Sequence, residues 1–207
     1  LAQIEDIRSL VVVGGGTMGS GIAYVAVSRG LQVRMIEMDE AGAERAKAAI
    51  GKIAARQVKA GRLSEAKQAE LLARLSYATV YDGIETFDAA IASNTSTMSI
   101  TRLAGYSGRP PMFIGTHFFG PVERMPLVEI ILTPDTSNEV RKRTLKLLKT
   151  LRKTPLVVND GPGFFTSRCV ASYTGEALTL LAEGIAPARI DAAARRYGMV
   201  IGPCPMA

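Results

Sequence analysis

The sequence has few of the residues that usually build metal sites, disulfide frameworks or membrane spans. It contains one histidine and two cysteines in 207 residues. Cys169 and Cys204 have no second cysteine or histidine near them, so neither a disulfide framework nor a zinc site is expected. No apolar run approaches the roughly 18 residues that a membrane span requires, and the N-terminal residues do not resemble a signal peptide. We therefore expect reduced thiols, no metal, no membrane span and a cytoplasmic protein.

Acidic residues are the scarcer charged class. There are 25 Lys and Arg against 19 Asp and Glu, which gives a formal net charge of +6 at pH 7. This bias suits a polyanionic ligand, and a basic solvated surface explains it as well. Much of the excess lies in residues 141–153, where leucines recur at helical spacing without interleaved aromatics. We expect a surface helix there, opened by Thr136 and Glu139 at capping-box spacing, and no nucleic-acid partner.

Hydrophobic residues make up 47% of the chain and charged residues 21%, ordinary globular values that exclude disorder. Apolar runs alternate with helical patterns up to about residue 160, and only helical patterns follow. Strands joined by crossover helices indicate a parallel α/β sheet. We therefore place one domain at residues 1–160 and the beginning of an all-helical one at 161–207. Strands are predicted near residues 10–13, 31–36, 77–81, 90–93, 112–117, 127–132 and 156–158, and helices over 17–29, 40–59, 64–75, 98–104, 136–153, 164–183 and from 187 onward.

One connection is too short for this arrangement. Only residues 82–88 separate the strand ending at Tyr81 from the run beginning near Ala89. Parallel neighbouring strands need a crossover of about a dozen residues or more. Either these two strands are not parallel neighbours, or a strand and a helix are absent at this point.

A glycine motif follows the first predicted strand. Gly14, Gly16 and Gly19 form G-x-G-x-x-G at the start of the first helix. The first glycine allows a tight turn, the second lets backbone approach a pyrophosphate, and the third lets helix and strand pack closely. Glu37 ends the second strand, where an acidic side chain accepts from ribose hydroxyls and repels a 2′-phosphate. The pattern predicts a Rossmann-type, mostly parallel sheet with helices on both faces that binds NAD rather than NADP; a ligand-free turn beside a surface Glu is the alternative.

His117 is the only histidine, so any step that uses a histidine base depends on it. Glu129 lies twelve residues further on, a spacing at which a strand–turn–strand unit brings two side chains together. A carboxylate bonded to one ring nitrogen fixes the tautomer and leaves the other nitrogen as a base near neutral pH. A hydrogen-bonded core histidine and a Glu in an exposed ion pair are the alternatives.

Polar residues also follow the predicted strand that ends near Ser93. Asn94 and Ser96 stand in the run Ser-Asn-Thr-Ser at what we expect to be the carboxyl edge of the sheet. Ligands of open α/β sheets bind at that edge, and the same residue types cap helices. The two roles are compatible.

Five motifs recur together in one known family. They are V-V-G-G-G-T-M-G-S-G-I-A (12–23), A-S-N-T-S-T (92–97), G-T-H-F-F-G-P-V (115–122), M-P-L-V-E (125–129) and D-G-P-G-F (160–164). Through them nearly the whole chain resembles the NAD-dependent L-3-hydroxyacyl-CoA dehydrogenases of fatty-acid β-oxidation. Residues 152–168 look closest to the dehydrogenase part of multifunctional fatty-oxidation proteins, where it follows an enoyl-CoA hydratase.

The resemblance implies a role for each matching residue. His117 corresponds to the catalytic base, Glu129 to its orienting partner, and Ser96 to the hydroxyl that hydrogen-bonds the reacting oxygen of the substrate. The residues that correspond to the NAD site are Gly14, Gly16, Met18, Gly19 and Glu37, with Asn94 lining the nicotinamide pocket.

The chain departs from the family pattern at three places. Gly120 replaces an Asn of the monofunctional members, and Ser167 replaces an active-site Asn, so Ser167 is expected to donate a hydrogen bond over a shorter reach. Near residues 88–91 the family carries a further strand and helix with an Ile-Glu-Ala-Val-like motif. We hypothesise that this segment is missing here, at the link already found too short, and that the helical domain is truncated after Ala207.

The resemblance implies hydride transfer from C3 of an L-3-hydroxyacyl-CoA thioester to NAD, while His117 removes the hydroxyl proton. It also implies a homodimer or a subunit of a fatty-oxidation complex. Two alternatives are a related dehydrogenase of a non-thioester hydroxy acid and a catalytically weak NAD-binding subunit. The presence of His117, Glu129 and Ser96 together argues against the second, because a protein that only binds NAD needs no base.

Overall fold

Residues 7–83 and 91–206 are described by a computed structural model of the chain. They divide into two units. The larger unit contains the residues up to 95 together with 100–159, and the smaller unit contains 96–99 together with the residues from 160 onward. Residues 84–90 are not among those described, so the hypothesis of a missing segment near 88–91 falls outside them.

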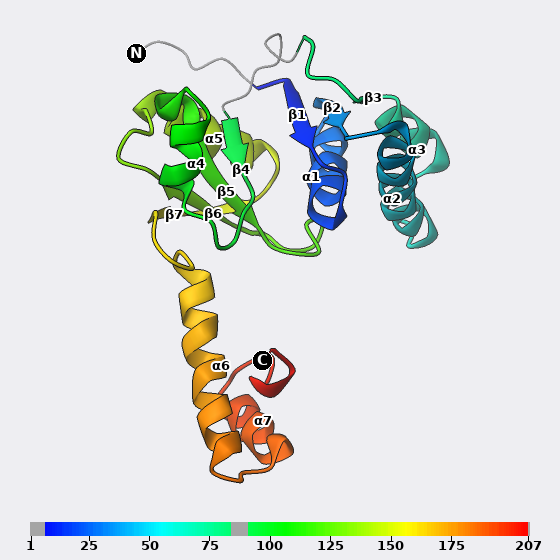
Figure 1. Cartoon of the computed structure of the whole chain (residues 1–207). Helices are drawn as coiled ribbons and strands as arrows, with labels where there is room; N and C mark the ends of the chain where they lie inside the picture. The colour runs from blue at the N-terminus through cyan, green and yellow to red at the C-terminus, as the bar shows by residue number, and fades with distance from the viewer. Residues whose placement is uncertain (1–6, 84–90, 207) are drawn as a thin grey trace. The chain divides into compact units, whose positions relative to one another are not determined.

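The first half of the larger unit is a three-stranded parallel sheet with its crossover helices (Figure 1). Its strand order is β1-β2-β3, and both neighbouring pairs are parallel. The chain passes from β1 through α1 to β2, and from β2 through α2 and α3 to β3. The bounds are β1 (Ser9–Val13), α1 (Thr17–Ser28), β2 (Gln32–Ile36), α2 (Glu40–Lys59), α3 (Glu65–Leu72) and β3 (Leu75–Ala78).

The second half of the larger unit is a four-stranded sheet in the order β4-β5-β6-β7. β4 and β5 are parallel, as are β6 and β7, whereas β5 and β6 are antiparallel. The turn between β5 and β6 is too short for a crossover helix, and so the chain reverses direction there. The bounds are β4 (Ile91–Ser93), α4 (Ile100–Tyr106), a 3-10 turn η2 (Pro110–Met112), β5 (Phe113–Phe118), β6 (Leu127–Leu132), α5 (Asn138–Thr150) and β7 (Thr154–Asn159).

The predicted α/β fold with a mostly parallel sheet is confirmed, and two predicted helix boundaries are wrong. Leu75, which we assigned to the apolar stripe of a helix, begins β3 and pairs with Val33 of β2. Thr136 does not open the basic helix. The Ser137 side chain accepts from Val140 N–H at the start of α5, because the Thr136 hydroxyl instead donates to the Phe113 carbonyl oxygen, 3.0 Å away, and ties this loop to β5.

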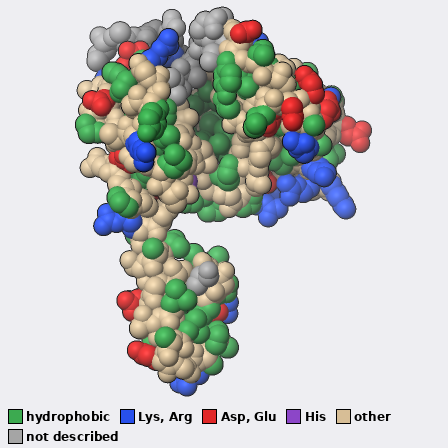
Figure 2. All heavy atoms as spheres, viewed as in Figure 1, with side chains coloured by type: hydrophobic (Ala, Val, Ile, Leu, Met, Phe, Trp, Pro, Cys, Tyr) green, Lys and Arg blue, Asp and Glu red, His purple; other side chains and the backbone are tan. Residues whose placement is uncertain are grey.

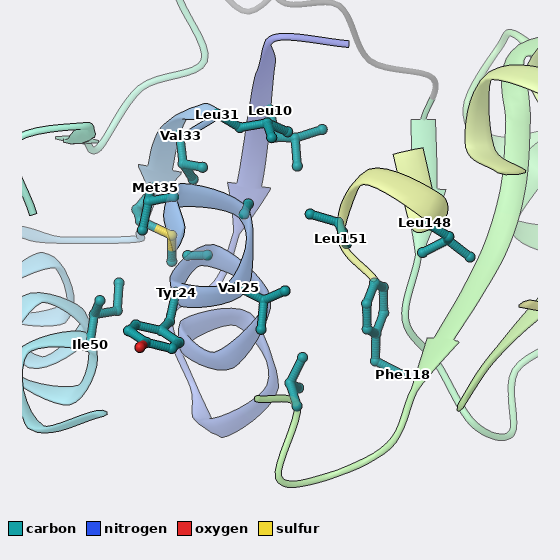
Figure 3. Packing of buried hydrophobic residues seen from close by; sticks show 14 of the residues in the cluster. Leu10, Tyr24, Val25, Leu31, Val33, Met35, Ile50, Phe118, Leu148 and Leu151 are labelled. Carbon is teal, nitrogen blue, oxygen red and sulfur yellow. The ribbon is translucent and has the colours of Figure 1, made fainter. Parts of the chain in front are cut away.

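The core of the larger unit draws on both sheets (Figure 3). Aliphatic side chains of β1, β2 and α1 are buried in the same cluster as Phe118 at the end of β5 and the leucines of α5. Val122, in the turn after β5, packs against α1 at Gly21, where a Cβ would lie 2.8 Å from the Val122 Cβ. Burial of each large aliphatic side chain stabilises the fold by about 1.5–3 kcal/mol, so this packing holds the two halves together.

The smaller unit is helical where the structure describes it. α6 (Thr166–Ala182) and α7 (Pro187–Arg196) are followed by a single 3-10 turn, η3 (Cys204–Met206). Asp191 on α7 accepts a hydrogen bond from Cys204 N–H at 3.0 Å, which ties this turn to α7. Cys169 and Cys204 are both free thiols. Across the described parts of both units, none of the helices is long and apolar enough to cross a membrane.

Candidate active site

A glycine-rich turn joins β1 to α1, and its glycines differ in backbone conformation and in the space around them. Gly14 has a φ of 84°, a left-handed conformation that favours glycine. A Cβ on Gly19 would lie 1.8 Å from the Gly14 carbonyl oxygen, so only glycine lets α1 approach the turn this closely. A Cβ on Gly16 would meet no atom within 4 Å. The turn is therefore tightly packed at Gly19 and open beside the backbone of Gly16.

The N-terminus of α1 adjoins this open space. Gly16 is the N-cap residue, and no side chain caps the helix there. Backbone N–H groups at the start of a helix, together with the positive end of the helix dipole, attract anions. Gly14, Gly16 and Met18 line one part of a cavity of about 590 Å³. The residues present therefore fit the pyrophosphate of a dinucleotide.

Glu37, directly after β2, is held against the same turn. Its Oε1 accepts a hydrogen bond from Gly15 N–H. A Cβ on Gly15 would lie 2.5 Å from that oxygen and 2.2 Å from the Ala46 Cβ, so any side chain there would push the carboxylate away. Each carboxylate oxygen accepts more than one hydrogen bond, which leaves capacity for ribose hydroxyls. Sequence reasoning gave Gly15 no role; the signal was the run of three consecutive glycines, of which Gly15 is the middle one.

His117 and Glu129 are brought together by the hairpin of β5 and β6. The antiparallel register places the two residues directly opposite each other. His117 Nδ1 lies 2.8 Å from Glu129 Oε2, and the exposed fractions are 8% for His117 and 0% for Glu129. A buried carboxylate partner selects the tautomer with the proton on Nδ1, so Nε2 is the acceptor. The arrangement is that of a base held by a carboxylate.

Two further contacts hold the backbone and ring around His117. Phe118 N–H donates to Asn94 Oδ1 at 2.7 Å, which links the residue after β4 to the end of β5. The Phe119 ring lies against the imidazole, with ring centroids 4.5 Å apart. Asn94 also lines the cavity that reaches the glycine turn. The predicted nicotinamide residue thus has its side-chain oxygen bonded to the strand that carries His117.

Ser96 and Ser167 belong to the smaller unit. Ser96 is exposed in the turn formed by residues 96–99, and Ser167 lies in the first turn of α6. Among the predicted catalytic residues, the geometry of the larger unit brings together His117 and Glu129. The roles of Ser96 and Ser167 stay predictions.

A buried lysine supports the turn that follows His117. Lys153, which we assigned to the basic solvated helix, is instead buried. Its Nζ donates to the carbonyl oxygens of Val122 and Met125 in the turn between β5 and β6. Burial lowers the pKa of Lys153 below its ordinary value, and the positive charge of Arg29 lowers it further. The signal in the sequence was the place of Lys153 in the chain. It directly precedes β7 and does not continue α5.

Comparison with protein-family models gives two matches. Residues 9–91 and 82–161 match the 3-hydroxyacyl-CoA dehydrogenase NAD binding domain, and residues 163–207 match the C-terminal domain of the same family. The first domain is matched in two pieces that share residues 82–91. The shared residues lie at the link where the crossover rule fails.

The curated relatives are longer proteins. The fatty acid oxidation complex subunit alpha of Psychrobacter cryohalolentis is 35% identical over 228 residues, which cover 97% of this chain and 32% of the relative. The protein of the same name from Shewanella baltica is 33% identical, covering 98% and 33%. The chain thus spans about a third of the length of these relatives. Since 97% of the chain is about 201 residues, about 27 of the 228 aligned positions have no residue in this chain.

Solved structures share the fold over almost the whole chain. The (S)-3-hydroxybutyryl-CoA dehydrogenase of Ralstonia eutropha is 34% identical with a TM-score of 0.94, covering 98% of this chain and 82% of that one. The 3-hydroxybutyryl-CoA dehydrogenase of Escherichia coli K12 is 30% identical with a TM-score of 0.92, covering 98% and 49%. Because the family models span most of the chain and agree with these structures, the chain belongs to the 3-hydroxyacyl-CoA dehydrogenase family.

Proposed function

We propose that this chain oxidises an L-3-hydroxyacyl-CoA thioester to the 3-oxoacyl-CoA with NAD⁺, as a step of fatty-acid β-oxidation. The observation that carries the proposal is the buried pair of His117 and Glu129 at the end of β5. The pair lies in the unit that matches an NAD binding domain. A protein that only binds a nucleotide has no use for a base held in this way.

The cofactor site is assigned to the turn after β1 and to the residue after β2. Backbone groups of Gly14 and Gly16, with Met18 beside them, hold the pyrophosphate, and Gly19 keeps α1 close to the turn. Glu37 accepts from the ribose hydroxyls, and its negative charge disfavours a 2′-phosphate, so NAD is preferred to NADP. When bound, NAD⁺ supplies the hydride acceptor, nicotinamide C4.

His117 acts as the general base. Its Nε2 takes the proton of the C3 hydroxyl while Nδ1–H stays bonded to Glu129 Oε2. The C3 hydrogen leaves with its electron pair as hydride, so the alcohol carbon becomes a ketone and the proton stays on His117. Glu129 stabilises the imidazolium that forms and keeps the ring in place. A positioned base of this kind contributes about 10²- to 10⁴-fold in rate.

Three further residues are assigned to substrate and cofactor. Ser96 donates a hydrogen bond to the reacting oxygen, and Ser167 donates a second one over a short reach. Asn94 lines the nicotinamide pocket. Because Asn94 Oδ1 accepts from Phe118 N–H, its amide NH₂ is the group available to a ligand.

The assembly and location of the protein follow from the same family. We infer that it works in the cytoplasm as a homodimer or as a subunit of a fatty-oxidation complex. The curated relatives carry the name of a complex subunit, which supports the second form. Light scattering of the purified chain distinguishes a dimer from a monomer that needs a partner, and fractionation of cells tests the location.

An assay of NADH absorbance tests the function directly. In the reductive direction the chain should oxidise NADH when acetoacetyl-CoA is added and should not do so with free acetoacetate. Turnover of the free acid alone would assign a non-thioester substrate. Tight NAD binding without turnover of either compound would reduce the protein to a binding subunit.

A further inference from the structure

The larger unit contains a second cavity, of about 510 Å³. The C-terminal end of α1, the connection from α2 into α3, the turn between β5 and β6, and the residues just before β7 line it. None of the residues that we assign to the cofactor, the substrate or the base is among its lining residues. Small-molecule sites in proteins have volumes of about 300–1,000 Å³. The cavity is therefore large enough for a ligand of its own.

The residues that line this cavity are strongly biased toward positive charge. Six of its 15 lining residues are basic and one, Glu123, is acidic. Figure 2 shows Lys and Arg side chains gathered below α2 and α3, around the turn that carries Arg62. Most of the net charge of +6 is thus concentrated at one cavity. The six basic residues are Arg29, Arg62, Lys67, Arg124, Arg152 and Lys153.

Carboxylates do not neutralise these six side chains. Glu123 forms its ion pair with Arg56, which is not a lining residue, at 3.8 Å. Within residues 7–83 and 91–206, none of the six forms an ion pair with an acidic side chain. The charge of the cavity is therefore not balanced by the described part of the chain.

Helix ends balance only a part of this charge. Arg29, Arg62 and Arg152 follow the C-terminal ends of α1, α2 and α5, where the helix dipole attracts cations. Each helix end carries only about half a negative charge. Lys67 lies in the first turn of α3, the end at which a cation is disfavoured. A surplus of about three positive charges therefore remains.

Lys153 is the buried member of this group. Its ammonium has three N–H donors, and the carbonyl oxygens of Val122 and Met125 accept two of them. Burial and the positive charge of Arg29 lower the pKa of Lys153, and the Glu123 carboxylate opposes both. A third donor and an environment short of negative charge therefore face the cavity.

We propose that this cavity binds a small anion with two or more phosphate groups, at a site separate from those of NAD and the acyl-CoA. Arg62 and Arg124, both exposed, contact the phosphates through their planar guanidinium groups. Lys153 donates its third N–H to a phosphate oxygen. A single phosphate monoester carries only about 1.5 to 2 negative charges at pH 7, so more than one phosphate is needed to balance the surplus. This inference does not rest on the proposed function.

Calorimetric titration with inorganic pyrophosphate tests the proposal on the full chain. Saturating NADH keeps the probe from the glycine turn, and an ionic strength of about 0.15 M screens diffuse attraction. We expect saturable binding of one pyrophosphate per chain and a Tm that rises with its concentration. Sodium chloride of equal ionic strength should not raise the Tm in this way. Absence of saturable binding would overturn the proposal.

Three charge variants locate the bound anion. Arg62→Gln and Arg124→Gln should each weaken pyrophosphate binding at least about tenfold, because each removes charged hydrogen bonds. Arg141→Gln is the matched control, since Arg141 is exposed on α5 and does not line the cavity. Equal weakening by all three variants would show diffuse attraction and contradict the site. Because Arg62 and Arg124 lie outside the glycine turn, this comparison decides the matter even if NADH does not bind.

Coenzyme A separates this site from that of the substrate. The Kd for pyrophosphate should change less than about twofold when coenzyme A is present. If coenzyme A displaced the pyrophosphate, the phosphates of the substrate would occupy this cavity, and a separate site would be ruled out.

Discussion

His117 and Glu129 face each other across the hairpin of β5 and β6, with Nδ1 and Oε2 2.8 Å apart and the carboxylate fully buried. Strand pairing positions both residues, so their separation depends on backbone register rather than on the conformation of a loop. A one-residue slip of that register would turn one of the two side chains to the other face of the sheet. The fold itself therefore holds the base beside its partner.

Replacement of His117 by alanine tests the base. We expect kcat to fall at least about 10²-fold, since a positioned base contributes that much or more, while the Kd for NADH changes little. Steady-state kinetics with acetoacetyl-CoA and a fluorescence titration with NADH measure the two quantities. Wild-type turnover in a folded His117→Ala protein would remove His117 from the mechanism.

Glu129→Gln and Glu129→Leu separate charge from hydrogen bonding. Glutamine still accepts from Nδ1–H but lacks the charge that stabilises the imidazolium, so kcat should fall at least about tenfold. Leucine removes the acceptor as well and should lower kcat further, because the ring is then free to rotate. The pH–rate profiles of all three proteins provide the comparison. Equal kcat values and superimposable profiles would show that Glu129 does not act on His117.

Two glycine substitutions in the same turn should affect different properties, one the stability of the fold and the other the binding of the cofactor. A Cβ on Gly19 would lie 1.8 Å from the Gly14 carbonyl oxygen, so Gly19→Ala should lower the free energy of unfolding by about 1–3 kcal/mol or more. Gly16 has a φ of −62° and open space around it, so Gly16→Ala should lower the free energy of unfolding by only about 0.5–1 kcal/mol, the difference between glycine and alanine at a helix N-cap. Its methyl group instead enters the cofactor space and should raise the Kd for NADH at least about tenfold. Urea unfolding and NADH titration read out both effects, and a stable Gly19→Ala protein would contradict the close approach.

Glu37→Ala tests cofactor choice. Hydrogen bonds to a charged group contribute about 1.5–3 kcal/mol, so the KM for NAD should rise about 10- to 100-fold. The KM for NADP should change less, because the repulsive charge is lost together with the hydrogen bonds. Asp39→Asn is the control, since Asp39 caps α2 through Gly42 N–H and asparagine keeps that cap. If Glu37→Ala and Asp39→Asn gave the same two KM values, Glu37 would not contact the ribose.

Lys153→Met tests the support beneath the catalytic hairpin. The variant leaves the Val122 and Met125 carbonyls without their donor, which should lower the free energy of unfolding by about 1–3 kcal/mol. Lys149→Met, at an exposed position of α5, should change it by less than about 0.5 kcal/mol. Chemical denaturation of the three proteins at neutral pH makes the comparison, and equal stability of both variants would deny Lys153 this role.

The same lysine makes stability depend on pH in a defined direction. Burial lowers the pKa of Lys153 below the ordinary 10.5 in the folded chain, so the unfolded chain binds more protons between the two values. The stability advantage of the wild type over Lys153→Met should therefore grow as pH rises toward about 10.5 and level off above it. An advantage that shrank over this range would mean that the folded state favours the charged form.

Local features of the sequence were sufficient to predict much of the fold. The strand–turn–helix around the glycine motif depends on residues that are close in the chain, and glycine spacing reveals it. Strand alternation and helical periodicity located most other elements for the same reason. The boundaries failed where a long-range contact competed with a local preference: Leu75 pairs with β2, and the Thr136 hydroxyl bonds to Phe113 instead of capping α5.

The sequence by itself determined that a dinucleotide motif, one histidine and a carboxylate twelve residues later occur in one α/β chain. Only the tertiary structure decided that Gly15 receives the Glu37 carboxylate and that Lys153 is buried beneath the hairpin. Such contacts join residues far apart in the chain. They depend on strand register and close packing, which no local pattern of residues encodes.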